Sequence, residues 1–345
     1  MFVLEDKIRK NIKALKPYAS ARDEFSGIAD VYLDANENPF PNGKNRYPDP
    51  HQRLLRNSLA QLKGVESSML FTGNGSDEVI DLLMRVFCNP GVDNIIILPP
   101  TYGMYSVSAA VNDVDVREVP LTSLFQPDID AIFDAADEKS KLLFICSPNN
   151  PTANLVNKEI IIELLNRFEG LVVIDEAYID FCPSASATNL INEYPNLFIM
   201  QTLSKAWGLA GVRIGIGIGR TDIIRVLDNI KPPYNISVLN ATAALEALSD
   251  STLMNEKVNI LLGERVWLMN ALQQLKSVVK IFASDANFVL VKIKDADQVY
   301  QKLIEQKIVV RNRSSVILCE QCLRITVGTP EENRKLIKAL HKLEA

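Results

Sequence analysis

Residues 197–211 read LFIMQTLSKAWGLAG and place Lys205 between an apolar run and a glycine-rich stretch. Lysine side chains are usually solvated, so a lysine at the end of what looks like a buried strand needs an explanation. The run LFIM (197–200) is continuously apolar rather than alternating, which is typical of a strand covered on both faces. We therefore expect Lys205 to follow the carboxyl end of a strand in a covered sheet.

Five other apolar runs along the chain have the same character. Segments with helical periodicity separate most of them, such as SDEVIDLLMRVF (76–87) and NKEIIIELLNRF (157–168). This alternation predicts the α/β class, with a mostly parallel sheet and helices on both sides. The remaining strands are expected at SMLFT (68–72), NIIIL (94–98), KLLFIC (141–146), LVVID (171–175) and VRIGIGIG (212–219). An alanine-rich helical stretch from 238 to 276 then leads to strand and helix patterns that predict a smaller α+β domain.

The N-terminal region has two patterns of its own. Residues 2–15 predict an amphipathic helix, because Leu4, Ile8, Ile12 and Leu15 fall on one face. The stretch LDANENPFPNGKNRYPDP (33–50) is too rich in turn-forming residues to be regular. We expect a long irregular connection there, and such segments are usually functional or disordered.

Composition excludes several classes of protein. The net charge of -5 and the pI near 5.3, with no basic run, argue against a nucleic-acid partner. No apolar run approaches the roughly 20 residues of a membrane span, and the N-terminus lacks the apolar core of an export signal. Five cysteines, an odd number, predict reduced thiols and a cytoplasmic location. Cys319 and Cys322 form a lone C-x-x-C, and because zinc prefers four ligands we expect no metal site.

Polar residues come directly after each predicted strand. The segments are GNGSDE (73–78), PPTYGMY (99–105), SPNNPT (147–152), DEAY (175–178) and TLSK (202–205). Ligands of parallel α/β sheets bind outside the carboxyl ends of the strands, so these segments should converge at one edge. Each segment alone has an ordinary explanation: the glycines can make a tight turn, with Ser76 as a helix cap, and Asn150 before Pro151 is a common turn pair.

Taken together, these residues suit one ligand, pyridoxal 5′-phosphate (PLP). An aldehyde cofactor needs an amine, which Lys205 provides. The pyridine nitrogen needs a carboxylate, Asp175, to stay protonated and act as an electron sink. Tyr178 and Asn150 can donate to the ring oxygen, and Tyr102 can cover the ring face.

The phosphate of this cofactor needs an anion-binding cradle. The turn Gly75–Ser76–Asp77 opens a predicted helix, whose free N–H groups can approach an anion. Ser204 and Arg213 can add further donors. We expect the backbone N–H of Asp77, rather than its negative side chain, to face the phosphate.

Several motifs span nearly the whole chain in one order: PYASAR (17–22), LDANENPF (33–40), RYPDP (46–50), GNGSDE (73–78), CSPNNPT (146–152), VIDEAYIDF (173–181), TLSKAWGLAGVRIG (202–215) and CLRITVGT (322–329). In this the chain resembles the fold-type I PLP-dependent aminotransferases, and among them those that act on histidinol phosphate. One departure is Ala153, where that family usually has glycine. The resemblance implies a seven-stranded, mostly parallel sheet in a large domain over 33–237. It also implies a linking helix and small domain over 238–345, joined by the N-terminal segment 1–32.

The resemblance also implies roles for individual residues. Lys205, Asp175 and Tyr178 are the catalytic residues, with Lys205 forming the Schiff base and then serving as general base. Tyr47 reaches the phosphate from a partner subunit, which implies a homodimer with shared sites. The cofactor contacts are Gly75, Ser76, Asp77, Tyr102, Asn150, Asp175, Tyr178, Thr202, Ser204, Lys205, Arg213 and Tyr47, and the substrate contacts are Tyr18, Asn36, Arg311 and Arg324.

The reaction implied is the ping-pong transamination of L-histidinol phosphate with 2-oxoglutarate, giving imidazole acetol phosphate and glutamate in histidine biosynthesis. The alternatives are an aromatic amino-acid aminotransferase or a PLP-dependent decarboxylase of a phosphorylated amino acid. A nucleotide-binding oxidoreductase, suggested by GVRIGIGIG (211–219), is disfavoured because G-x-G-x-x-G would need glycine at Arg220. A PLP-binding regulator is disfavoured because no basic helix–turn–helix precedes residue 30.

Overall fold

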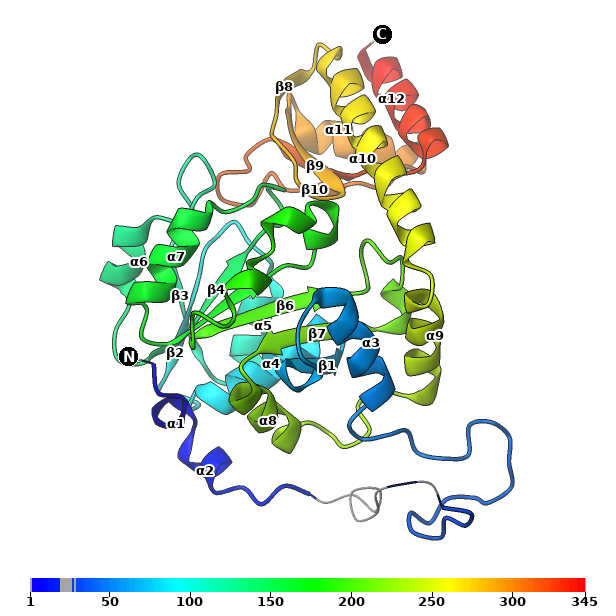
Figure 1. Cartoon of the computed structure of the whole chain (residues 1–345). Helices are drawn as coiled ribbons and strands as arrows, with labels where there is room; N and C mark the ends of the chain where they lie inside the picture. The colour runs from blue at the N-terminus through cyan, green and yellow to red at the C-terminus, as the bar shows by residue number, and fades with distance from the viewer. Residues whose placement is uncertain (1, 19–26, 28, 345) are drawn as a thin grey trace.

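The computed structural model describes residues 2–18, 27 and 29–344, and it places them in two domains, each built on one sheet (Figure 1). The larger sheet has seven strands in the order β1–β7–β6–β5–β4–β2–β3. Its neighbouring strands are parallel except at β7, which is antiparallel to both β1 and β6. The strands are β1 (Leu70–Asn74), β2 (Asn94–Ile97), β3 (Asp115–Glu118), β4 (Ser140–Cys146), β5 (Leu171–Asp175), β6 (Leu197–Thr202) and β7 (Ile214–Gly219). The predicted mostly parallel sheet is confirmed.

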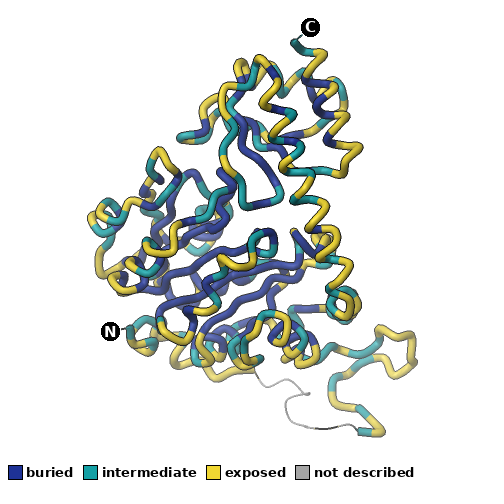
Figure 2. The backbone as a smooth tube through the Cα atoms, turned by 45° about the horizontal axis from the view of Figure 1, so that its top comes forward, coloured by how far each residue is buried: buried dark blue, intermediate teal, exposed yellow. Residues whose placement is uncertain are grey.

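Helices cover both faces of this sheet, which explains why the strands are continuously apolar. Along β5, Val172 and Ile174 enter one core layer, while Leu171 and Val173 enter the other. Figure 2 shows the strands buried and the outer sides of the helices exposed. The first layer includes α3 (Arg53–Lys63), α6 (Ile129–Ala135), α7 (Lys158–Arg167) and α9 (Val238–Leu248), and the second includes α4 (Ser76–Phe87), α5 (Met104–Val111) and α8 (Thr221–Ile230). Each fully buried aliphatic side chain contributes about 1.5–3 kcal/mol, so the two layers fix the strand ends firmly.

The strand that the apolar pattern does not reveal is β3. It reads DVRE and lies at the edge of the sheet, where its side chains are exposed or half-buried. An edge strand has a single neighbour and needs no continuous apolar run. Short 3-10 turns complete the large domain at Ser67–Met69, Ile179–Phe181, Pro183–Ala185, Ala187–Leu190 and Ala210–Val212.

The smaller domain is an antiparallel sheet with helices packed on it, ordered β10–β11–β9–β8. Its elements are α10 (Ser251–Gln273), β8 (Val278–Ile281), β9 (Phe288–Ile293), α11 (Ala296–Glu305), β10 (Arg311–Asn312), β11 (Cys322–Thr326) and α12 (Pro330–Glu344). These elements have the mixed α+β composition that the sequence pattern predicts for this region, and β10 is only two residues long. The alanine-rich stretch forms two helices, because Asp250 interrupts it and caps α10 through the backbone N–H of Thr252.

The N-terminal segment differs from its prediction. Two short helices, α1 (Leu4–Lys7) and α2 (Lys10–Lys13), replace the single helix over 2–15. Ile8 between them is extended and buried in the core layer of α4, and the Arg9 N–H donates to the Val86 carbonyl at 3.0 Å. The described start of the segment 1–32 therefore lies on the large domain, not on the small domain as expected, while residues 19–26 lie outside the described residues.

Residues 33–50 have no helix or strand, as predicted, and extend away from the body of the chain (Figure 1). We call them the arm. Among the helices that the structure describes, none combines the length and apolarity needed to cross a membrane.

Candidate active site

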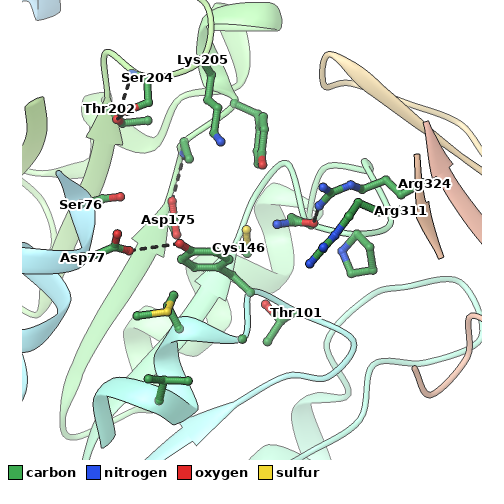
Figure 3. Close-up of a pocket in the computed structure, with 18 of the residues that line it drawn as sticks. Ser76, Asp77, Thr101, Cys146, Asp175, Thr202, Ser204, Lys205, Arg311 and Arg324 are labelled. Carbon is green, nitrogen blue, oxygen red and sulfur yellow. Dashed lines mark hydrogen bonds between the residues drawn. The ribbon is translucent and has the colours of Figure 1, made fainter. Parts of the chain in front are cut away.

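A cleft of about 560 Å³ lies between the strand ends of the large sheet and the small domain. Residues that come after β1, β2, β4, β5 and β6 line it, as the rule for parallel sheets predicts. The small domain closes the other side with side chains from β10, β11 and the loop between them (Figure 3). The predicted site residues that converge there are Ser76, Asp77, Tyr102, Asn150, Asp175, Tyr178, Thr202, Ser204, Lys205, Arg213, Arg311 and Arg324.

Lys205 stands on the turn after β6, and its amine points into the cleft (Figure 3). Hydrogen bonds fix this turn: the Ser204 N–H donates to the Thr202 hydroxyl at 3.1 Å, and the Gly208 N–H to the Lys205 carbonyl at 3.1 Å. The ammonium lies 5.5 Å from the centre of the Tyr178 ring. Part of the side chain stays accessible in the open cleft, yet desolvation, and then the nearby Arg324, lower the pKa of Lys205. A neutral amine is therefore easier to reach here than on the surface.

Asp175 is the last residue of β5 and is only 3% exposed. Its Oδ2 accepts from the Tyr105 hydroxyl at 2.6 Å, and its Oδ1 accepts from the Ala177 N–H at 3.0 Å. Burial raises the pKa of Asp175, while the two hydrogen bonds oppose that rise because they favour the carboxylate. Sequence reasoning missed Tyr105, which lies on α5 and is fully buried. Its sequence signal, an aromatic residue on a short apolar helix, is the same as that of a core residue.

An anion-binding cradle lies where α4 begins. Gly75, with φ of 78°, turns the chain into α4, and its N–H donates to the Arg213 carbonyl at 2.9 Å. A Cβ on Gly215 of β7 would overlap the backbone of Gly75 and Ser76, so glycine lets the strand and the turn approach closely. The free N–H groups at the start of α4, the Ser76 and Ser204 hydroxyls and the Arg213 guanidinium supply donors that fit a phosphate.

The side chain of Asp77 contacts two neighbours at the edge of the cleft, while the expectation that its backbone N–H faces the phosphate stays a prediction. Its carboxylate accepts from the Tyr102 hydroxyl at 3.1 Å and pairs with Arg213 at 3.3 Å. It therefore holds both side chains in position at the edge of the cleft. Tyr102 in turn lies edge-on to Tyr105, with ring centres 5.6 Å apart.

The small domain supplies cations. Arg324 of β11 donates to the Asn150 Oδ1, and its guanidinium lies 5.3 Å from the centre of the Phe288 ring. Arg311 and Arg313 line the cleft beside it. Sequence reasoning identified Arg311 and Arg324 but not Arg313 or Phe288.

Four predicted site residues do not line the cleft: Gly75, which turns the chain into α4 beside it, and three residues that lie away from it. Tyr47, in the arm, stacks on Tyr234 with ring centres 4.4 Å apart and is half exposed. Tyr18 is 74% exposed, and Asn36 is also exposed. Within a single chain, none of the three lines the cleft that holds Lys205.

Comparisons with known proteins agree with this geometry. The model of the family "Aminotransferase class I and II" matches residues 31–340. A histidinol-phosphate aminotransferase of Flavobacterium psychrophilum is 52% identical over 99% of this chain and 99% of its own. The crystal structure of the Clostridium acetobutylicum histidinol-phosphate aminotransferase superposes with a TM-score of 0.80 at 28% identity, covering 87% of this chain and 90% of that one.

A third relative was solved with a cofactor. The Sinorhizobium meliloti histidinol-phosphate aminotransferase, in complex with pyridoxal 5′-phosphate, has a TM-score of 0.77 at 22% identity, covering 86% of this chain and 84% of that one. The full-length match to the family model and the 52% identity establish the kinship. The chain belongs to the aminotransferase class I and II family, in which it groups with the histidinol-phosphate aminotransferases.

Proposed function

We propose that the chain transfers the amino group of L-histidinol phosphate to 2-oxoglutarate, giving imidazole acetol phosphate and glutamate, as a step of histidine biosynthesis. One observation carries the proposal: the Lys205 amine and the buried Asp175 carboxyl share a cleft that arginines of the small domain line from the other side. This arrangement combines an amine for an aldehyde cofactor, a partner for its ring and a receptor for an anionic substrate.

The cofactor is PLP, which supplies an electron sink for the bonds of the substrate carbon. Asp175 would accept a hydrogen bond from the ring nitrogen, and Tyr102 would cover the ring. The Tyr178 hydroxyl and the Asn150 amide would donate to the ring oxygen. Burial raises the pKa of Tyr178, so its hydroxyl stays protonated and able to donate.

The phosphate of PLP would be held at the start of α4. The backbone N–H groups of Ser76 and Asp77 and the hydroxyl groups of Ser76, Thr202 and Ser204 would bind it, together with Arg213. Gly215 lets β7 pack closely against this turn, so the core fixes the backbone part of the cradle.

We assign the proton transfer to Lys205. Its amine would accept the proton that leaves the substrate Cα and hold it in the cleft for the second proton transfer. A general base must lie within reach of its proton and have a pKa near the working pH. Burial and the neighbouring Arg324 lower the pKa of Lys205 toward that range.

The substrates are expected to react in turn, since one cleft serves both. Arg311 and Arg324 would bind the anionic end of each, because a guanidinium fits both phosphate and carboxylate oxygens. An aromatic amino acid would bring these cations a single carboxylate charge, whereas a phosphate ester carries about -1.5 to -2 charges at neutral pH, which favours the phosphorylated substrate over the aromatic alternative.

We further propose a homodimer in the cytoplasm. Tyr47, Tyr18 and Asn36 are exposed outside their own cleft, which suits residues that complete the cleft of a second copy. Sedimentation analysis should give a dimer, and mixing Tyr47→Ala with Lys205→Ala subunits should restore activity in part if sites are shared. The free thiols of all five cysteines fit a reducing compartment.

An amine panel tests the reaction itself. The holoenzyme is incubated with 2-oxoglutarate and L-histidinol phosphate, L-phenylalanine or L-threonine phosphate, and keto product, glutamate and carbon dioxide are measured. The proposal expects keto product and glutamate from histidinol phosphate at the highest kcat/KM. Release of carbon dioxide from a phosphorylated amino acid, without keto product from histidinol phosphate, would point to the decarboxylase instead.

A further inference from the structure

Three guanidinium groups, not two, meet on the small-domain side of the cleft. Arg311 lies directly opposite Arg324 in the antiparallel pair β10–β11. Arg313 stands two residues after Arg311, so it shares the same face of the extended chain. Its N–H donates to the Cys322 carbonyl at 2.8 Å, which continues the β10–β11 ladder. All three side chains line the cleft that contains Lys205.

These cations have no carboxylate partner within the described part of the chain. The acids of the cleft, Asp77 and Asp175, lie on its large-domain side. There Asp77 already pairs with Arg213. The Nε atoms of Arg313 and Arg324 are buried without a hydrogen-bond partner among the described residues. Burying a donor of a charged group without a partner is costly, so these two guanidinium groups favour an anion beside them.

The pairing of β10 with β11 adds repulsion between like charges to the cost of burying these donors. Like charges directly opposite each other in an antiparallel pair destabilise it. Arg311 and Arg324 occupy such a pair, and Arg313 adds a third positive charge beside them. Arg313 and Arg311 also lower the pKa of the half-buried Arg324, after the larger effect of desolvation. Because the three positive charges repel one another, the cluster suits a ligand with more than one negative charge.

We propose that Arg313 is a specificity-determining residue that binds the phosphate dianion of the substrate and contributes little to the binding of a carboxylate. This inference rests on the proposed function, which supplies a phosphate ester and a dicarboxylate as alternating ligands of one cleft. A carboxylate has two oxygens and one charge, which one bidentate guanidinium can satisfy. A phosphate ester carries about -1.5 to -2 charges on three oxygens at neutral pH and has capacity for a further guanidinium.

The test compares Arg313→Gln with the parent holoenzyme in separate half-reactions, monitored through the spectrum of the bound cofactor. The amino donors are L-histidinol phosphate, L-histidinol and L-glutamate. The variant should lose about 10- to 100-fold in kcat/KM for histidinol phosphate, the value of one or two charge-assisted hydrogen bonds. Its kcat/KM should change less than about 3-fold for glutamate and for histidinol, which lacks the phosphate. Arg334→Gln, an exposed arginine on α12, is the matched control and should behave as the parent enzyme.

Two further readouts separate binding from a structural role. The ratio of parent to variant kcat/KM for histidinol phosphate should shrink as the pH falls below about 6, where the phosphate loses its second charge. Calorimetric titration of the holoenzyme with inorganic phosphate should show weaker binding by Arg313→Gln, with unchanged binding of acetate.

Three results would overturn the assignment: equal losses for glutamate and histidinol phosphate, a ratio that does not depend on pH, or no loss at all. If the parent enzyme itself does not react with histidinol phosphate, the proposed function fails. The phosphate and acetate titrations then still decide whether Arg313 selects a dianion.

Discussion

Replacing Tyr105 with phenylalanine removes a single hydroxyl from the interior of the large domain. That hydroxyl donates to the Asp175 Oδ2 at 2.6 Å, and it lies fully buried behind the cleft. A hydrogen bond to a charged acceptor contributes about 1.5–3 kcal/mol. Because the bond favours the carboxylate form, its loss should raise the pKa of Asp175 beyond the rise that burial already causes.

The consequence is a lower affinity for PLP, with a shifted pH dependence. A protonated ring nitrogen needs an ionised Asp175, so the affinity for PLP should fall as the pH decreases through the pKa of Asp175. In Tyr105→Phe that fall should begin at a higher pH, and near neutral pH the affinity should be about 10- to 100-fold lower. Titration of the apoenzyme with PLP, monitored by protein fluorescence over a range of pH, measures both effects without turnover.

The control is Tyr300→Phe, which makes the same chemical change on α11 of the small domain. It should bind PLP as the parent protein does. If Tyr105→Phe matches the parent in PLP affinity at every pH, the hydroxyl does not support Asp175 and the reasoning is wrong. Thermal unfolding of the apo variants checks that the fold is retained.

Three other changes test separate parts of the site. Gly215→Ala places a methyl group against the backbone of Gly75. We expect the free energy of unfolding, measured by denaturant titration, to fall by about 1–3 kcal/mol. We also expect weak retention of PLP, measured by absorbance. Burial raises the pKa of Glu176 from 4.5 to about 6. The free energy of unfolding should therefore be highest below pH 4.5 and should fall by about 2 kcal/mol as the pH rises through 6. Unfolding of Glu176→Gln should lack that pH dependence. Arg324→Ala should keep bound PLP but weaken both half-reactions about 10-fold or more, and unchanged saturation by both substrates would contradict its assignment.

The large domain could be predicted from sequence because its strands carry a strong signal. Strands covered on both faces must be apolar at every position, and all six predicted runs match their strands within two residues. β3 lacks this signal because it lies at the edge with polar side chains. The break between α1 and α2 could not be predicted, because Ile8 leaves the helix to pack against α4, a long-range contact that local periodicity does not encode.

The cleft could be predicted from the polar residues at the end of each strand, because parallel topology brings those ends together. Tyr105 and Arg313 were missed for different reasons. A buried tyrosine on an apolar helix has the pattern of a core residue, and its bond to Asp175 is a tertiary contact. Arg313 comes after a two-residue strand, and only the pairing with β11 shows that it faces the cleft. The roles proposed for Tyr47, Tyr18 and Asn36 in the cleft of a second copy stay predictions.

A single half-turnover shows whether the bound cofactor at Lys205 takes the amino group of histidinol phosphate. The purified holoenzyme, with its visible cofactor band recorded, receives L-histidinol phosphate without any keto acid, and Lys205→Ala serves as the parallel sample. We expect the visible band of the parent enzyme to disappear while an aminated-cofactor band grows at shorter wavelength, with about one keto product per site. Lys205→Ala should form no keto product. A parent enzyme whose band ignores histidinol phosphate but responds to another amine would contradict the substrate, and a protein that develops no cofactor band with added PLP would contradict the role of Lys205.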